Sequence, residues 1–103
     1  MSNITVPFRQ MRPTLKTIQA QTQILLAAPG IEWPQKDYAL FFAMADISKR
    51  MENPTRLQMV TQIAVWLRFY NRLINSIEEG NPLRVDIRTQ FDQLSEPYKE
   101  LLT

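Results

Sequence analysis

The chain has 103 residues, a net charge of +2 and 45% hydrophobic residues, which is the size and composition of one globular domain. It contains no cysteine and no histidine. This excludes disulfides, zinc sites built from these residues, and catalysis by a Ser–His or Cys–His pair.

Four prolines each stand at the start of a segment whose apolar residues follow helical spacing: Pro13, Pro34, Pro54 and Pro82. Proline suits the first turn of a helix, because its missing N–H has no partner to lose there. Asn53 and Asn81 directly precede two of these prolines and are expected to be N-caps. The two glycines, Gly30 and Gly80, fall where the preceding helices are expected to end.

The first helix is predicted over residues 13–28, with a single apolar stripe of Leu15, Ile18, Thr22, Leu25 and Leu26. Residues 1–12 precede it as an extended arm, without the charged leader and apolar block of a signal peptide. The second helix is predicted over residues 34–52. It is apolar on nearly all sides and is therefore expected to be buried on nearly all sides.

The third helix, over residues 54–79, has an apolar arc wider than half its circumference. Residues 82–94 fit a fourth helix, although Leu83, Val85 and Ile87 also alternate as in a strand. A lone strand would have no pairing partner, which favours the helix. The segment Ser95-Glu96-Pro97 then indicates a cap and a short helical restart through Leu102.

Short connections between long helices favour antiparallel neighbours. The prediction is therefore an all-α fold, an up-down antiparallel bundle of about four helices with a short C-terminal helical segment. Residues 13–103 would form this single domain. The longest uninterrupted apolar stretch, 38–45, has eight residues, far fewer than the about 20 that cross a bilayer, so no membrane partner and a cytoplasmic location are expected.

No residue pattern indicates an active site, a metal site or a cofactor site. The two glycines are 50 residues apart, so they cannot form a phosphate-binding loop. Asp92, Glu96 and Glu100 would share a face if one helix ran through them, but a solvated acidic face is the usual meaning of such spacing. We therefore expect a protein that is not an enzyme.

The wide apolar arcs of the second and third helices suggest a partner interface. Five aromatic residues lie on the outer parts of these arcs: Tyr38, Phe41, Phe42, Trp66 and Phe69. Aromatic side chains left exposed by a small bundle are typical anchors of protein interfaces. The alternative is that the N-terminal arm and the C-terminal helix cover them.

The charge distribution suggests a second kind of partner. Residues 1–77 hold nine basic and four acidic side chains, a net of +5, whereas residues 78–103 hold three and six, a net of −3. Five cations could form one phosphate-binding patch: Arg9, Arg12, Lys16, Arg68 and Arg72. The alternative is that the acidic C-terminal segment neutralises the basic helices within the molecule.

Three functions follow from these patterns. The favoured one is a non-enzymatic interaction module (an adaptor, assembly or regulatory protein) that docks a protein partner or itself, with a homodimer as the expected form. A nucleic-acid-associated protein that uses the basic face is the first alternative. A pocket between helices for a small hydrophobic ligand is the second.

Overall fold

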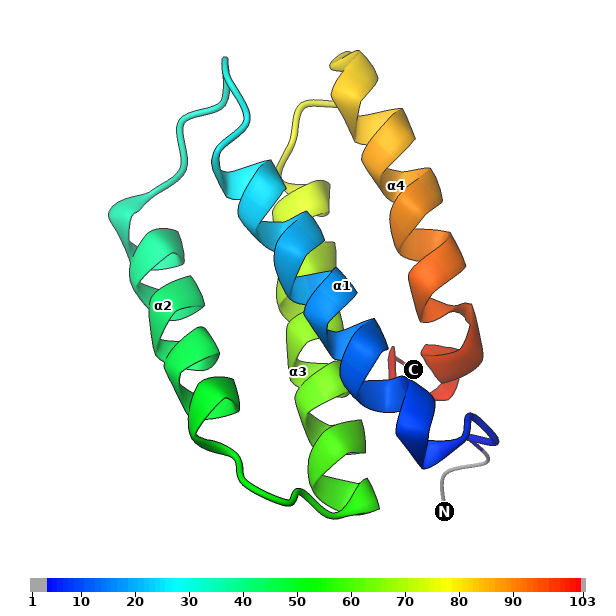
Figure 1. Ribbon diagram of the computed structural model, residues 1–103. Helices are drawn as coiled ribbons and strands as arrows, with labels where there is room; N and C mark the ends of the chain where they lie inside the picture. The colour runs from blue at the N-terminus through cyan, green and yellow to red at the C-terminus, as the bar shows by residue number, and fades with distance from the viewer. Residues whose placement is uncertain (1–3, 103) are drawn as a thin grey trace.

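The computed structural model describes residues 4–102, which form four α-helices and a C-terminal 3₁₀ helix with no strand among them. The elements are α1 (Phe8–Leu26), α2 (Gln35–Arg50), α3 (Arg56–Asn75), α4 (Pro82–Ser95) and η1 (Glu96–Leu102). Consecutive helices alternate in direction, so the predicted all-helical up-down bundle is confirmed (Figure 1). The alternation of Leu83, Val85 and Ile87 belongs to a helix, as predicted.

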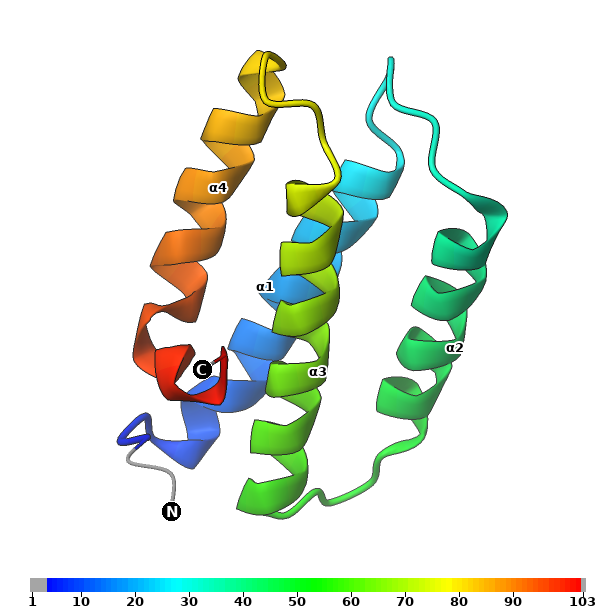
Figure 2. The ribbon, with the colours of Figure 1, turned by 180° about the vertical axis from the view of Figure 1, so that it is seen from behind.

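The helices differ in how closely they pack. α1 and α3 share the largest contact in the molecule, and α4 with η1 packs on one side of this pair. α2 stands on the opposite side, as the views from front and back both show (Figures 1 and 2). This edge position of α2 decides which apolar residues the bundle leaves exposed.

The first helix begins five residues earlier than the sequence predicts. Pro7 is its N-cap and Phe8 its first residue, so the extended arm ends at Pro7, and Pro13 lies inside α1. A proline there removes one backbone hydrogen bond of the helix. Met11 is fully buried, and packing this side chain into the core offsets the lost bond. Residues 1–3 of the predicted arm lie outside the described residues.

The predicted caps are right at one helix and wrong at another. The Asn81 side chain accepts a hydrogen bond from the Leu83 N–H at 3.0 Å, as expected of an N-cap. Asn53 instead adopts a left-handed backbone with φ of 46°, and Thr55 caps α3. Thr55 Oγ1 accepts from the Gln58 N–H at 3.1 Å while Gln58 Oε1 accepts from the Thr55 N–H at 2.8 Å, a reciprocal capping box.

The glycines do not cap the preceding helices. The C-cap residues of α1 and α3 are Ala27 and Ser76, both with right-handed helical backbone. Gly30 lies further on, in the turn after α1, with φ of 82°. A left-handed backbone there is open to glycine at little steric cost, so Gly30 allows the chain to turn toward α2.

Helix α3 supplies the centre of the core. Seven of its side chains are at most 1% exposed: Met59, Ile63, Trp66, Leu67, Tyr70, Leu73 and Ile74. The Tyr70 ring meets Phe91 of α4 edge to face, with ring centroids 5.7 Å apart. Tyr98 of η1 is 1% exposed, so the C-terminal segment packs against this core.

Burial of Tyr70 makes the stability of the fold depend on pH at the alkaline end. Burial raises its pKa from 10.0 to about 12, because the phenolate would lose its hydration in the core. The folded chain therefore holds this proton more tightly than the unfolded chain does. The stabilisation is complete below pH 10.0 and is lost as pH rises toward about 12.

We expect the free energy of unfolding to fall by on the order of 2 kcal/mol across this window. Urea denaturation at several pH values measures the fall. Tyr70→Phe should reduce it, whereas Tyr38→Phe, at a half-buried position, is the matched control. A residual fall is expected in Tyr70→Phe, because burial also raises the pKa of Tyr98. Equal pH dependence in Tyr70→Phe and the wild type would contradict the prediction.

Candidate functional site

Helix α2 is buried along one stripe only, so the prediction of a helix buried on nearly all sides is wrong. Its buried residues are Asp37, Phe41 and Met44. Its two edges expose apolar side chains: Leu40 is 42% exposed, Phe42 64% and Ile47 56%. The physical reason is position, because α2 lies outside the α1–α3 pair and none of the elements within residues 4–102 covers its outer side (Figure 2).

Polar contacts hold the inner stripe of α2 to α3 at two levels. Near the start of α2, the Arg72 guanidinium donates to Asp37 Oδ1 at 2.9 Å, and the Asp37 side chain is 4% exposed. Near its end, Ser48 Oγ donates to Gln62 Oε1 at 2.9 Å and accepts from Trp66 Nε1 at 3.1 Å. These bonds place the rest of α2, including its exposed edges, at a defined rotation against the bundle.

The aromatic residues predicted as an interface lie mostly inside the molecule. Phe41 is 7% exposed, Trp66 0% and Phe69 4%. Phe41 and Trp66 meet edge to face with centroids 5.4 Å apart, and Trp66 and Phe69 with centroids 6.4 Å apart. The expectation of exposed aromatics is therefore wrong for these three. Phe41 of α2 and Trp66 of α3 bury each other in the contact between these helices, and Phe69 packs beside Trp66.

Tyr38 and Phe42 border a hollow between α1 and α2. Tyr38 is half-buried and donates to the Leu26 carbonyl at 3.2 Å, whereas Phe42 remains largely exposed. The hollow has a volume of about 170 Å³. Its lining is mostly apolar and consists of Gln23, Leu26, Ala27, Tyr38, Phe41 and Phe42. We call it the upper hollow, because it lies toward the α1–α2 connection.

A second hollow lies toward the other end of α1, where α1 begins and the chain passes from α2 to α3. Its volume is about 400 Å³. It is lined by Phe8, Arg9, Arg12, Pro13, Asn53, Pro54 and Met59. Phe8 is 45% exposed at its rim. This lower hollow therefore combines apolar surface with two guanidinium groups, a combination that the sequence did not suggest.

The five cations predicted as one phosphate patch do not lie together. Arg9, Arg12 and Lys16 are exposed along α1. Arg68 and Arg72 project from the side of α3 opposite to the stripe that meets α1, as their positions on that helix require. Arg68 donates to the Leu101 carbonyl at 2.8 Å, and Arg72 holds Asp37.

Arg72 makes a further contact that ties it to the fold. Its guanidinium carbon lies 5.3 Å from the centroid of the Phe69 ring, within the range of a cation–π interaction. Together with the ion pair to Asp37, this uses both the charge and the planar face of the side chain inside the α2–α3 contact. Arg68 and Arg72 are exposed as well, but unlike the cations of α1 they are engaged in contacts within the fold.

The acidic residues of the C-terminal region do not form one helical face. α4 ends at Ser95 and the chain continues as a 3₁₀ helix, so Asp92 and Glu100 lie on different elements. Within residues 4–102, no group of three or more Asp, Glu, His or Cys side chains is placed to hold a metal ion. None of the helices described is both long enough and apolar enough to cross a membrane.

Comparison with known proteins adds no assignment, since no family model, curated protein or solved structure matches the chain. What the chain binds is therefore inferred from its surface chemistry. Two features of that surface are the exposed apolar edges of α2 and the two hollows along α1.

Proposed function

We propose that the chain is a non-enzymatic protein–protein interaction module in which α2 is the docking element. The observation that supports this most directly is the exposure of Leu40, Phe42 and Ile47 on a helix that side-chain hydrogen bonds hold to α3. Large apolar side chains gathered on one element of a small domain are typical of interaction surfaces. α2 presents them on two edges, on either side of its buried stripe.

The outer edge of α2 has the spacing of a helix-docking face. Leu40, Ala43 and Ile47 follow one another at intervals of three and four residues, and all three are exposed. This is the spacing by which two helices interlock their side chains. Lys36 and Arg50 extend the same stripe at both ends. The partner helix could belong to a second copy of the chain or to another protein, and the experiment separates the two.

The solution mass of the purified chain, measured by light scattering over a range of concentrations, tests self-association. Ile47→Asp and Phe42→Asp each place a charge on one edge of α2, and Val85→Asp is the matched control, since Val85 is 66% exposed on α4. All three variants should keep the helical circular dichroism of the wild type. We expect an α2 variant to lose a dimer that Val85→Asp retains.

If the wild type is a monomer, the next experiment tests whether α2 binds a different protein. The same four chains then serve as baits in a lysate of the source cells, followed by mass spectrometry. The proposal requires a protein that is retained by the wild type and by Val85→Asp but lost by an α2 variant. A monomer whose α2 variants retain the same proteins as the control would contradict the proposed function.

The two alternatives have weaker support. Nucleic-acid binding through five cations on one face would require Arg68 and Arg72 beside those of α1, and both are engaged elsewhere. The apolar upper hollow, at about 170 Å³, is smaller than the range of about 300–1,000 Å³ typical of small-molecule pockets. The lower hollow reaches that range but has two arginines in its lining.

A further inference from the structure

The upper and lower hollows lie on one flank of α1. Phe8 and Arg12 line the lower hollow, and Gln23 and Leu26 line the upper one. Successive positions in this set are separated by close to a whole number of helical turns. All four side chains therefore project toward the same side of α1. About 15 residues of helix separate the two hollows, which corresponds to about 22 Å along the axis.

Helices α1 and α2 diverge between the two hollows. They lie close near their connection and move apart toward the beginning of α1 (Figure 1), and their mutual contact is small. Trp66 and Met59 of α3 are both buried; Trp66 contacts Phe41 of α2, and Met59 lines the lower hollow. The flank of α1, the facing edge of α2 and the two hollows together are called the α1–α2 groove.

Each end of the α1–α2 groove has an exposed aromatic ring. Phe42, 64% exposed, borders the upper hollow, and Phe8, 45% exposed, borders the lower one. Aromatic rings beside a concave apolar surface are favourable anchor points for apolar side chains of a partner. An occupant that uses both hollows therefore needs apolar side chains about 22 Å apart.

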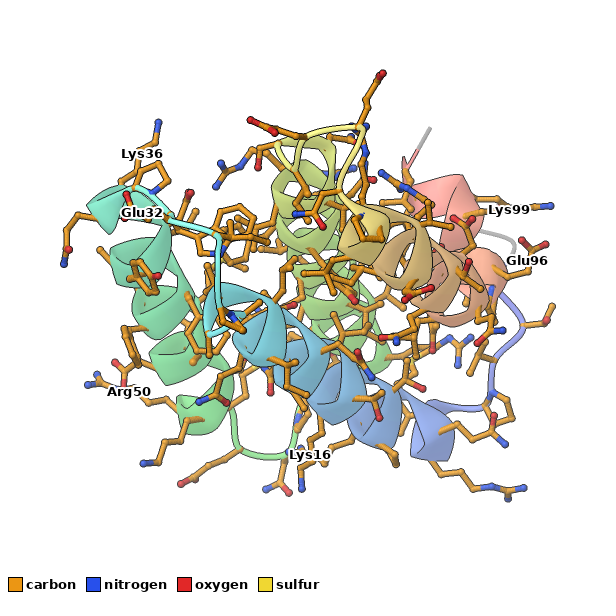
Figure 3. The ribbon with its side chains drawn as sticks, turned by 90° about the horizontal axis from the view of Figure 1, so that it is seen from above. Lys16, Glu32, Lys36, Arg50, Glu96 and Lys99 are labelled. Atoms are coloured by element: carbon orange, nitrogen blue, oxygen red, sulfur yellow. The ribbon has the colours of Figure 1, made fainter. Side chains whose placement is uncertain are left out.

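The charge of the α1–α2 groove is positive. α1 contains no acidic residue, and Arg9, Arg12 and Lys16 are exposed along it. Figure 3 shows Lys16 and Lys36 on different sides of the molecule. Arg50, on the outer edge of α2, pairs with Asp46 at 3.1 Å. Within residues 4–102, no hydrogen bond or ion pair is seen for the side chains of Arg9, Arg12 or Lys16.

A fourth cation faces this row across the groove. The bond from Tyr38 to the Leu26 carbonyl sets the level of the antiparallel helices. Lys49 is eleven residues after Tyr38, and Lys16 is ten residues before Leu26. Lys49 and Lys16 therefore lie at about the same level along the two antiparallel helices, and Lys49 is exposed as well. Like charges on both walls call for negative charge between them.

We propose that the α1–α2 groove binds an acidic amphipathic segment of a partner protein, about four helical turns long. Apolar side chains of the segment enter the upper hollow beside Phe42 and the lower hollow beside Phe8. Its carboxylates meet Arg12, Lys16 and Lys49 between the hollows. The inference rests on the proposed function and names the partner chemistry for one edge of α2. The apolar lining of the upper hollow favours a protein segment over a nucleic acid, whose backbone offers no apolar anchor.

Peptide display against the intact chain tests this. A library of random peptides of about 16 residues, long enough to span the groove as a helix, is selected on the wild type. Binding of the selected peptides is then measured by fluorescence polarisation at low and high salt. We expect peptides rich in Asp and Glu, with apolar residues at helical spacing, and affinities that weaken as salt increases.

The variants locate the binding site of these peptides. Arg12→Glu combined with Lys16→Glu should weaken binding at least about tenfold, and Phe42→Asp should do the same. Lys36→Glu is the matched charge control, since Lys36 is exposed on α2 away from the groove. Val85→Asp is the apolar control, and neither control should change the affinity. All the altered residues are at exposed positions, so circular dichroism should show wild-type helicity throughout.

Several results would overturn the inference. Selected peptides that are neutral or basic, or that bind the groove variants as tightly as the wild type, contradict it. Peptides whose binding is weakened by Ile47→Asp and not by Phe42→Asp would show that the docking site is the outer edge of α2. That result contradicts the groove as the binding site and leaves the proposed function intact. Duplex or single-stranded DNA bound through Arg12 and Lys16, with no peptide selected, replaces the inference with nucleic-acid binding. If nothing binds the groove, the mass measurement on Ile47→Asp still decides the proposed function.

Discussion

Trp66→Ala is expected to lower the free energy of unfolding by about 3–5 kcal/mol, the range for removing a buried tryptophan. Trp66 is 0% exposed, and its ring contacts both Phe41 and Phe69 edge to face. Alanine leaves a cavity between α2 and α3 and removes the hydrogen bond to Ser48. Since native domains are stable by about 5–15 kcal/mol, this one change removes a large share of the total.

Urea denaturation followed by circular dichroism measures the effect. Phe42→Ala is the matched control, because Phe42 belongs to the same aromatic cluster but is 64% exposed. It should change the free energy of unfolding by less than about 1 kcal/mol. Similar losses in the two variants would show that the α2–α3 contact is looser in solution than in the structure. The pair also separates a core aromatic from an exposed aromatic within one predicted set.

Arg72→Met is expected to destabilise the fold by about 2–3 kcal/mol. Removing one partner of a fully buried ion pair costs about 3–5 kcal/mol, because the remaining charge loses its compensation. Asp37 is such a charge, with its side chain 4% exposed, but the Arg72 side chain is 50% exposed, so the loss is smaller. Methionine keeps much of the apolar stem against Phe69 and removes the charge.

The effect of Arg72→Met should be concentrated in α2. Hydrogen exchange measured by mass spectrometry is expected to show reduced protection in α2 and unchanged protection in α1 and α3. Asp37→Leu introduced together with Arg72→Met should recover much of the stability, because no unpaired charge remains. Lys99→Met is the control, since Lys99 pairs with Glu96 at 3.2 Å on the surface and surface pairs contribute little. Uniform loss of protection over all helices would contradict the role assigned to this pair.

Much of the fold followed from local patterns. The apolar stripe of α1 predicted its buried face, and Leu15, Ile18, Thr22, Leu25 and Leu26 are all buried. Asn81-Pro82 marked the beginning of α4, because capping depends on only a few neighbouring residues. Local signals failed where two of them competed. Pro54 pointed to Asn53 as the cap of α3, yet Thr55 with Gln58 forms the better-satisfied pair of hydrogen bonds.

The beginning of α1 shows how packing overrides a local rule. Pro13 predicted the first turn of the helix, and the chain is helical from Phe8. A proline in the interior of a helix costs about 3 kcal/mol, which is why the local rule places it in the first turn. Met11, fully buried, contributes a comparable gain only because α3 and the rest of the core are there to receive it. No property of residues 7–12 alone reveals that gain.

The candidate site, too, was predictable from the sequence only in part. Composition and periodicity by themselves determined that this is an all-helical bundle with more apolar helix surface than one core needs. Which part of that surface stays exposed was decided by tertiary structure alone. The hydrophobic effect favours the burial of an apolar side chain but has no direction. It therefore does not determine which neighbouring residues bury that side chain. α3 buries Phe41 and leaves Phe42 in solvent, one residue away, because α2 sits at the edge of the bundle in a single rotation.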